Sequence, residues 1–412
     1  MEALLAPSIA IVASLCLLFI LLYKRVNLGI TLNATALLLA FLAVGWDKIP
    51  NVVYEATSDP LTISVVAATF VIMLISQLYK ETGLVNRLSD SVSKLVNNPK
   101  IVMAVIPAII GLLPVAGGAL TSAPLVDIEA EKLGIKTEKK AYINLWFRHT
   151  VFPVYPLSQP LIVTAAITGV ALPLIILRQI PVVATMIILG FLVGFWGIRN
   201  KKEPKATQGA RSNFNKFLIA FLPILGAIAL DIVLNALVPG IGSEGFDVLL
   251  SVTIGLLILL FICRSDFKVF TKPLKNWSIY GITLAAYGAF LLRATFAAAG
   301  ISGVLQTFLS TNSIDIVILL ILIPAVLGFL TGSPLGGATI GVSILAGILT
   351  FSPKVAALIY ISAYLGYTVS PTHLCLQFTA EYFACSLRKM YRYVIPSILA
   401  SFLVAILVYF LF

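Results

Sequence analysis

The fold of this chain is decided by the stretch Trp146-Phe147-Arg148-His149-Thr150-Val151-Phe152-Pro153-Val154-Tyr155-Pro156-Leu157-Ser158-Gln159-Pro160. It lies in a hydrophobic segment of membrane-spanning length, yet it carries an arginine, a histidine and three prolines. Ionisable side chains are costly at membrane depth and mark functional sites there. Proline removes a backbone donor, and hydrocarbon tolerates the resulting break only where protein or water takes up the freed groups. The stretch therefore predicts a helix unwound around a binding site.

The composition is that of a helical membrane protein. Hydrophobic residues make up 60% of the 412 residues and charged residues only 11%, which no soluble chain of this length combines. The apolar runs are continuous rather than alternating, so they predict helices and not a β-barrel. We attribute the net charge of +11 to basic loops that set membrane orientation, and not to nucleic-acid binding.

Ten apolar runs predict about ten transmembrane helices of an all-α polytopic protein. They are Pro7–Tyr23, Leu28–Trp46, Leu61–Tyr79, Ala141–Ala165, Leu172–Gly197, Phe217–Val238, Phe246–Cys263, Ile279–Phe296, Val355–Phe383 and Val394–Phe412.

Two further apolar segments are interrupted near their middle. Ile101–Leu133 is broken at Leu113–Pro124, and Ile314–Leu349 is broken at Thr331–Gly337. Each half is too short to cross a bilayer alone, so both segments predict re-entrant hairpins with tips at mid-membrane depth. The alternative is an ordinary pair of tilted helices with a flexible joint.

The distribution of basic residues predicts the topology. If the chain starts outside and each hairpin returns to its own side, nearly all of the 28 lysines and arginines fall in inner loops. Lys48 and Lys354 lie outside, and Arg148, Arg178 and Arg293 lie within spans. This asymmetry is the positive-inside rule. It predicts a membrane protein with both termini extracytoplasmic, a first span that is retained rather than cleaved as a signal, and a cytoplasmic linker at 198–216.

The linker separates two halves that repeat each other. A shift of about 217 residues aligns the two hairpins, and a similar shift aligns 142–159 with 360–377. The aligned identities are Tyr142/Tyr360, Ile143/Ile361, Thr150/Thr368, Val151/Val369, Pro153/Pro371 and Gln159/Gln377. Together with the charge count, this predicts two inverted-topology repeats, 1–197 and 217–412, as in secondary transporters.

The hairpin tips and the two broken helices are expected to meet near the bilayer midplane and form the substrate site. Helix N-termini there suit an oxyanion, and unwound carbonyls suit Na⁺. The predicted substrate-binding residues are Gly117, Gly118, Thr121, Ser122, Arg148, His149, Ser158, Gln159, Thr331, Gly332, Ser333, Gly336, Gly337, Thr368, Ser370, Thr372, His373 and Gln377. The residues expected to bind Na⁺ as a coupling ion are Ala119, Thr121, Ser333 and Thr339.

Arg148 is the main electrostatic indication of a substrate. A guanidinium pairs best with a bidentate carboxylate, and its own broken helix holds no acid. The alternatives are that it reaches an inner vestibule or pairs with Asp231 or Glu381. The only two histidines, His149 and His373, each lie in a broken helix and can bind an anion, carry a proton or hold the unwound turn.

Other charged residues and the cysteines are less informative. Arg178, Asp231, Arg293 and Glu381 are not assigned to the site, although Asp231 is a candidate proton carrier or partner of Arg293. The cysteines Cys16, Cys263, Cys375 and Cys385 have no metal-ligand spacing, so the sequence predicts neither a disulfide nor a metal site.

In this order of hairpin and broken helix, repeated and inverted, the chain resembles the ion-transporter superfamily from Leu61 to Phe412. That group includes divalent-anion/sodium symporters, gluconate-type permeases, dicarboxylate carriers, arsenite exporters and Na⁺/H⁺ antiporters. Trp146-Phe147-Arg148-His149 and Ser370-Pro371-Thr372-His373-Leu374-Cys375 look like an uncharacterised prokaryotic branch of it. The resemblance implies an elevator mechanism, in which a transport domain slides against a dimeric scaffold. The Ser-Asn-Thr tip motif of the dicarboxylate symporters is absent, so their specificity and sodium sites do not carry over.

The leading hypothesis is therefore a secondary active transporter of a small organic anion coupled to Na⁺ or H⁺, acting as a homodimer. The alternative is a cation/proton antiporter, which needs a buried acid at the crossing helices, and none lies in the four tip segments. An enzyme is not expected, since the sequence offers no metal-ligand cluster and no Ser/His/Asp set. A channel is disfavoured because inverted repeats around broken helices serve alternating access.

Overall fold

A computed structural model describes residues 7–96, 98–113, 118–198, 210–238, 240–263, 267–300, 315–346 and 348–412, and these form helices joined by turns. The helices are α1 (Pro7–Tyr23), α2 (Leu28–Leu39), α3 (Ile49–Ser58), α4 (Pro60–Glu81), α5 (Leu84–Leu95), α6 (Pro99–Gly111), α7 (Gly118–Lys132), α8 (Thr137–Thr150), α9 (Gln159–Thr168), α10 (Leu172–Phe195), α11 (Ala210–Leu237), α12 (Phe246–Cys263), α13 (Phe267–Thr271), α14 (Trp277–Ala298), α16 (Ile316–Thr331), α17 (Pro334–Leu345), α18 (Pro353–Thr368), α19 (Leu374–Tyr382) and α20 (Leu387–Leu411).

Seven helices of the described ranges are long and apolar enough to cross a membrane, counting Thr137–Thr168 as one. They coincide with seven of the ten predicted spans, so the chain is an all-α protein with several candidate membrane spans. The runs predicted at Pro7–Tyr23 and Leu28–Trp46 form shorter apolar helices. The run predicted at Val355–Phe383 is divided into α18 and α19.

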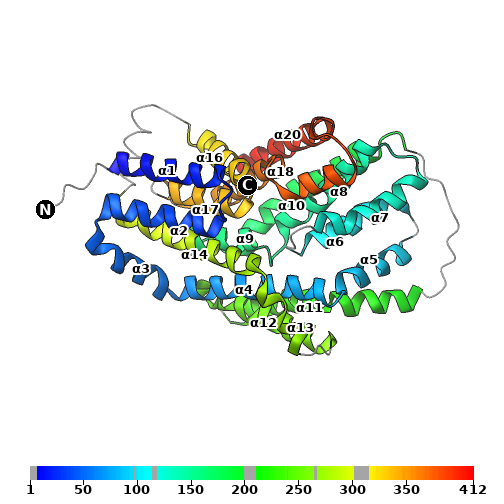
Figure 1. The fold of residues 1–412 in the computed structure, drawn as a ribbon, viewed down its shortest axis with the longest axis horizontal. Coiled ribbons are helices and arrows are strands. Elements are labelled where there is room, and N and C mark those ends of the chain that lie inside the picture. The colour runs from blue at the N-terminus through cyan, green and yellow to red at the C-terminus, as the bar shows by residue number, and fades with distance from the viewer. Residues whose placement is uncertain are drawn as a thin grey trace.

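The helices pack into two groups. The first group is α1–α5 with α11–α14, and the second is α6–α10 with α16–α20. Figure 1 shows α4, α5 and α11–α13 along the lower side, with α6–α8, α10, α16–α18 and α20 above them. Apart from the consecutive helices α5 and α6, the main contacts between the groups are those of α9 with α4 and α14, and of α17 with α14.

Two helices of the second group are interrupted at the positions that the prolines predict. The first stops at Thr150, makes a 3-10 turn at Phe152–Val154 and resumes at Gln159. The second stops at Thr368 and resumes at Leu374. A proline lacks the amide hydrogen and its ring collides with the preceding turn, so Pro153 and Pro371 favour the breaks at these positions.

The two segments predicted as hairpins each form a pair of helices in contact, α6 with α7 and α16 with α17. Their breaks are shorter than predicted. The first ends before Gly118, so the residues from Ala119 to Pro124 are helical rather than part of a tip. Pro124 removes one hydrogen bond inside α7 without ending the helix. The second break consists only of Gly332 and Ser333.

Glycines permit the closest helix contacts in the second group. A Cβ on Gly337 of α17 would lie 2.6 Å from the Cα and N of Gly328 in α16. These are backbone atoms, so they can yield only if the two helices separate. The contact requires glycine at 337. Glycine is required at 328 by a different neighbour, because its Cβ would collide with the backbone of Ala363 in α18.

We therefore expect Gly337→Ala to lower the free energy of unfolding by about 1–3 kcal/mol, the usual cost of overpacking. Gly226→Ala is the matched control, because its Cβ would meet only Cδ1 of Ile258, the end of a flexible side chain. Both changes raise helix propensity equally. Thermal unfolding in detergent measures the difference between the two variants. Equal unfolding midpoints would contradict a requirement for glycine at 337.

Candidate functional site

Arg148 lies in the last turn of α8 and is 5% exposed. Its guanidinium packs against Gly118, the first residue of α7, where a Cβ would lie 2.8 Å from the Arg148 Cζ. Any other residue at 118 would displace the guanidinium. Glycine at this position therefore brings the charge to the start of the helix.

The buried guanidinium is incompletely satisfied. Its Nη1 atom has no hydrogen-bond partner, and within the described parts of the chain Arg148 forms no ion pair. Neither alternative partner is beside it, since Asp231 faces Asp247 and Glu381 is exposed. A buried unpaired cation is strongly destabilising unless a counter-charge arrives. The positive end of α7 also favours an anion at this point.

His149 is oriented by the backbone around the first break. Its Nδ1 lies 2.7 Å from the carbonyl oxygen of Leu145, which can only accept, so Nδ1 carries the hydrogen. The lone pair of Nε2 then faces the Tyr367 hydroxyl at 3.4 Å. Tyr364 donates to the carbonyl oxygen of His149 at 2.9 Å. Two tyrosines of α18 thus hold the end of α8 in place.

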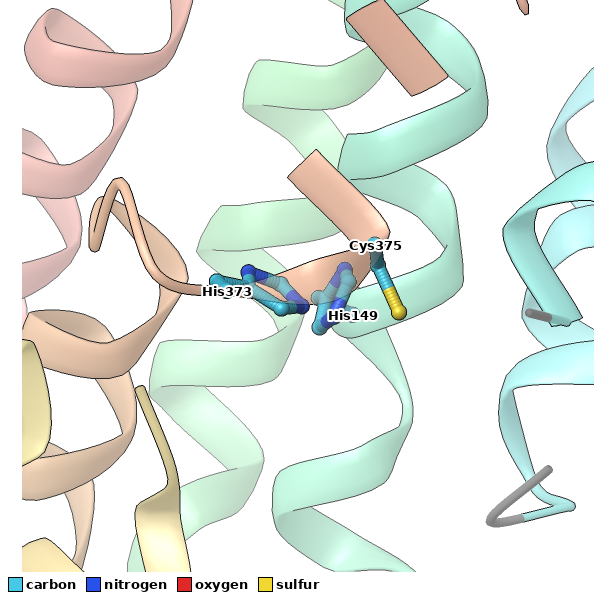
Figure 2. A group of neighbouring side chains, drawn as sticks. All are labelled: His149, His373 and Cys375. Carbon is cyan, nitrogen blue, oxygen red and sulfur yellow. The ribbon is translucent and has the colours of Figure 1, made fainter. Parts of the chain in front are cut away.

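The second break brings His373 to the same place. Figure 2 shows the side chains of His149, His373 and Cys375 gathered between α8 and the segment that begins α19. The two imidazole rings are nearly perpendicular, with centroids 4.8 Å apart. His373 is 2% exposed, and its Nε2 has no hydrogen-bond partner. A second unpartnered polar atom therefore lies beside Arg148 and is available to a ligand.

These three side chains could also hold a soft metal ion. One nitrogen of each histidine and the sulfur of Cys375 all lie within 4.8 Å of one another, and this donor set suits zinc or monovalent copper. However, the charge of Arg148 acts on both His373 and Cys375 and opposes a cation. The arrangement consequently favours an anion. The spacing of the cysteines in the sequence did not indicate Cys375 as a ligand, because His149 and Cys375 come from different helices.

A buried hydrogen-bond network connects the helices next to Arg148. Asn144, four residues before Arg148 on α8, accepts from the Ser122 hydroxyl at 2.6 Å and donates to the Ala119 carbonyl and the Thr379 hydroxyl. This network joins α7, α8 and α19. Ser122 was among the predicted site residues and Asn144 was not, although the spacing of four residues places Asn144 and Arg148 on one helix face.

The tip between α16 and α17 meets the second break from the other side. A Cβ on Gly332 would lie 3.1 Å from the carbonyl carbon of Thr372. Ser370 donates to the Phe329 carbonyl, and its hydroxyl lies 2.8 Å from that of Thr372. Ser333 caps α17 through the Gly336 amide. The segment 369–373 therefore contacts both this tip and His149.

The remaining predicted residues have other surroundings. Thr331, Thr339 and Thr368 bond carbonyls of their own helices. Gln159 donates to the sulfur of Met73 on α4, and Gln377 donates to the Pro371 carbonyl.

Three predicted positions stay unassigned to a contact. Ser158 is buried, and its hydroxyl has no hydrogen-bond partner. Thr121 is partly buried on α7. Gly117 lies outside the described residues.

The four residues predicted to bind Na⁺ are divided between two helices. Ala119 and Thr121 lie on α7, which packs on α6, α8 and α19. Ser333 caps α17 and Thr339 lies within it, and this helix packs on α9, α14, α16 and α18. The helices α7 and α17 are not among the extensively packed pairs, and the Na⁺ site stays a prediction.

The unassigned charges lie apart from Arg148. Arg178 donates to the carbonyl oxygens of Leu174 and Phe412, between α10 and α20. Arg293 has Asp59 as its electrostatic neighbour. Asp231 has Asp247 as its electrostatic neighbour, which does not favour the alternative that Asp231 pairs with Arg293.

The fold and the site define a multi-pass α-helical membrane protein with a buried, partly unsatisfied cation beside two histidines. The chain matches the DUF401 family, described as a protein of unknown function, over residues 6–412, and it belongs to that family. No curated protein matches the chain.

The network around Asn144 gives a stability prediction. Asn144→Ala leaves the buried Ser122 and Thr379 hydroxyls and the Ala119 carbonyl without this partner, and each unsatisfied group costs about 1–3 kcal/mol. We expect a loss of about 2 kcal/mol or more in the free energy of unfolding, measured in detergent. The matched control is Ser401→Ala, whose hydroxyl bonds only its own helix. Similar losses in the two variants would contradict a special role for the network.

Proposed function

We propose that this protein is a secondary active transporter of a small organic anion of the carboxylate class, coupled to Na⁺ or H⁺. The observation that supports this most is Arg148, whose buried guanidinium has an unpartnered nitrogen at the start of α7. A carboxylate can accept two parallel hydrogen bonds from a guanidinium, and the unpartnered Nε2 of His373 supplies a further polar contact. An anion that binds here neutralises a charge that no carboxylate of the described residues pairs with.

The order of helices supports an inverted repeat. The helices α4 and α14 each have 22 residues. Two pairs of short helices and one long helix come later in each half, α6–α9 with α10 and α16–α19 with α20, and in the first half α5 lies between α4 and the first pair. In both halves the first short helix packs on the next two, α6 on α7 and α8, and α16 on α17 and α18. We infer that α6–α7 and α16–α17 are re-entrant hairpins and that the chain is a distant relative of the ion-transporter superfamily.

The boundary between the helix groups supports an elevator movement. The second group contacts the first through α9 and α17, whereas their counterparts α19 and α7 pack within the second group. If the halves are inverted repeats, a second state is expected in which α19 and α7 contact the first group while α9 and α17 pack within the second. In that state the site would open to the other side of the membrane. In this proposal the first group is the scaffold, and its exposed apolar helices supply the homodimer contact.

Arg148→Gln tests the anion site. A hydrogen bond to a charged group contributes about 1.5–3 kcal/mol, so we expect at least tenfold weaker binding of the anion. Without the anion, the variant should be at least as stable as the original protein, because a buried unpaired charge is removed. Binding is measured by thermal shift in detergent against a panel of mono-, di- and tricarboxylates, followed by uptake into proteoliposomes.

Arg178→Gln is the matched control, since Arg178 bonds only backbone carbonyls between two helices. We expect this variant to bind and transport as the original protein does. The anion proposal fails if no carboxylate stabilises the original protein, or if Arg148→Gln retains full uptake.

Cross-linking tests the elevator movement. Gln159 of α9 touches Met73 of α4 across the boundary between the groups. In an active background with the native cysteines replaced, a short cross-linker between cysteines at 73 and 159 should stop uptake, and cleavage of the linker should restore it. A pair at Thr57 and Tyr287, whose hydroxyls lie 2.8 Å apart within the first group, should leave uptake unchanged. Full uptake with 73 and 159 joined would exclude movement at this boundary.

A second candidate is a cation/proton antiporter. The observation that favours it is the pair of buried acids Asp231 and Asp247, which sequence analysis did not place together. Dye-quench measurements of Na⁺/H⁺ exchange in proteoliposomes separate the two functions. Exchange without any carboxylate, abolished by Asp231→Asn and retained by Arg148→Gln, would favour the antiporter.

A further inference from the structure

A cavity lies between the two helix groups and is not lined by Arg148. Its volume is about 290 Å³. The first group contributes the start of α4, the end of α11, the start of α12 and the 3-10 turn Ile241–Glu244 between them. The second group contributes the end of α9 and the start of α10. A ligand in this cavity would therefore touch both groups.

Two aspartates line this cavity and are almost fully buried. Asp231 is 8% exposed and Asp247 is 7% exposed. The Oδ1 atom of each has no hydrogen-bond partner. Each of the two carboxylates thus has an oxygen without a partner in the same cavity. Burying such oxygens is costly unless a ligand pairs with them.

Asn235 cannot supply the missing donors. Its side-chain nitrogen donates to the Asp231 carbonyl at 2.9 Å and to Oδ2 of Asp247 at 2.8 Å. An amide has two hydrogens, so both are in use. Its oxygen remains as a further acceptor and faces Gly242, where a Cβ would lie 3.1 Å from that oxygen and from Oδ2 of Asp247.

The described lining of the cavity does not balance the charge of the pair. Among the described residues that line the cavity, the only ionisable side chains are Asp231 and Asp247, and none is basic. Two like charges close together in a low dielectric cannot both persist without a counter-charge. The nearest additional ionisable group in the same turn is Glu244, which is also acidic.

We propose that this cavity binds a small hard cation between Asp231 and Asp247. The side-chain ligand atoms that the described lining offers are oxygens, two carboxylates and the amide oxygen of Asn235, and such ligands suit Na⁺, Mg²⁺ or Ca²⁺ rather than soft metals. The volume holds several waters at about 30 Å³ each, so the ion keeps part of its hydration. This site is separate from the four tip residues predicted for Na⁺.

The binding step does not rest on the transport proposal. If that proposal also holds, a cation here lies at the boundary that must move, and its binding would bias the position of the two groups. The closing experiment measures binding alone, so its outcome is distinct from that of the uptake measurements.

The test uses the full-length protein in detergent after treatment with chelator. Thermal unfolding is followed while Na⁺, K⁺, Mg²⁺ or Ca²⁺ is added, with choline chloride holding the ionic strength constant. Binding to the folded state raises the midpoint with concentration by mass action. We expect at least one of these ions to do so, and its apparent Kd to rise at least tenfold in Asp231→Asn and in Asp247→Asn.

Asp90→Asn, which removes an exposed acid of α5, is the matched control and should respond as the original protein does. Without added cation, the two cavity variants should be at least as stable as the original protein, because the repulsion is relieved. The proposal is overturned if no cation raises the midpoint beyond the choline control, or if both cavity variants respond unchanged. A stability that depends on pH through these residues but on no cation would also overturn it, since a shared proton would then neutralise the pair.

Discussion

The burial of the Arg148 guanidinium against the first residue of α7 constrains the rest of the second helix group. The charge can reach this point only because residue 118 has no side chain. It stays there without a carboxylate partner among the described residues. A fold that keeps an unsatisfied cation this deep must offset the cost elsewhere. The offset lies in the closely packed helices around it.

Those helices stabilise the site by hydrogen bonds that involve backbone carbonyls and residues at the two helix breaks. The Tyr364 hydroxyl takes up the carbonyl of His149 at the first break, and Ser370 donates to a carbonyl of α16 from the second break. Asn144 joins α7, α8 and α19 behind Arg148. Each break is therefore satisfied by a neighbouring helix, as unwound backbone in a membrane requires. The buried side-chain atoms that remain without a partner include those of Arg148 and His373 at the breaks, and of Asp231 and Asp247 between the helix groups.

Much of this could be predicted from local chemistry. Pro153 and Pro371 predicted the positions of both helix breaks, because the loss of an amide hydrogen affects the helix within about one turn. Apolar runs located seven candidate spans because their length is a property of the sequence alone. Cys375, Asn144 and Asp247 were missed because their roles depend on which helices become neighbours. The first tip was predicted too long, since one proline in a packed helix does not end it. Gly336 and Gly337 were predicted as ligand contacts, which stays a prediction, and the close approach of Gly337 to Gly328 could not be foreseen because it depends on how α16 and α17 pack.

The central claim is that Arg148 binds an anion that the chain itself does not provide. The most direct measurement is a cryo-EM structure in lipid nanodiscs with the carboxylate that most stabilises the protein. We expect density for the carboxylate that bridges the Arg148 guanidinium and the first turn of α7, next to His373. A guanidinium paired with an acidic side chain of the protein, with no added density at saturating carboxylate, would contradict it.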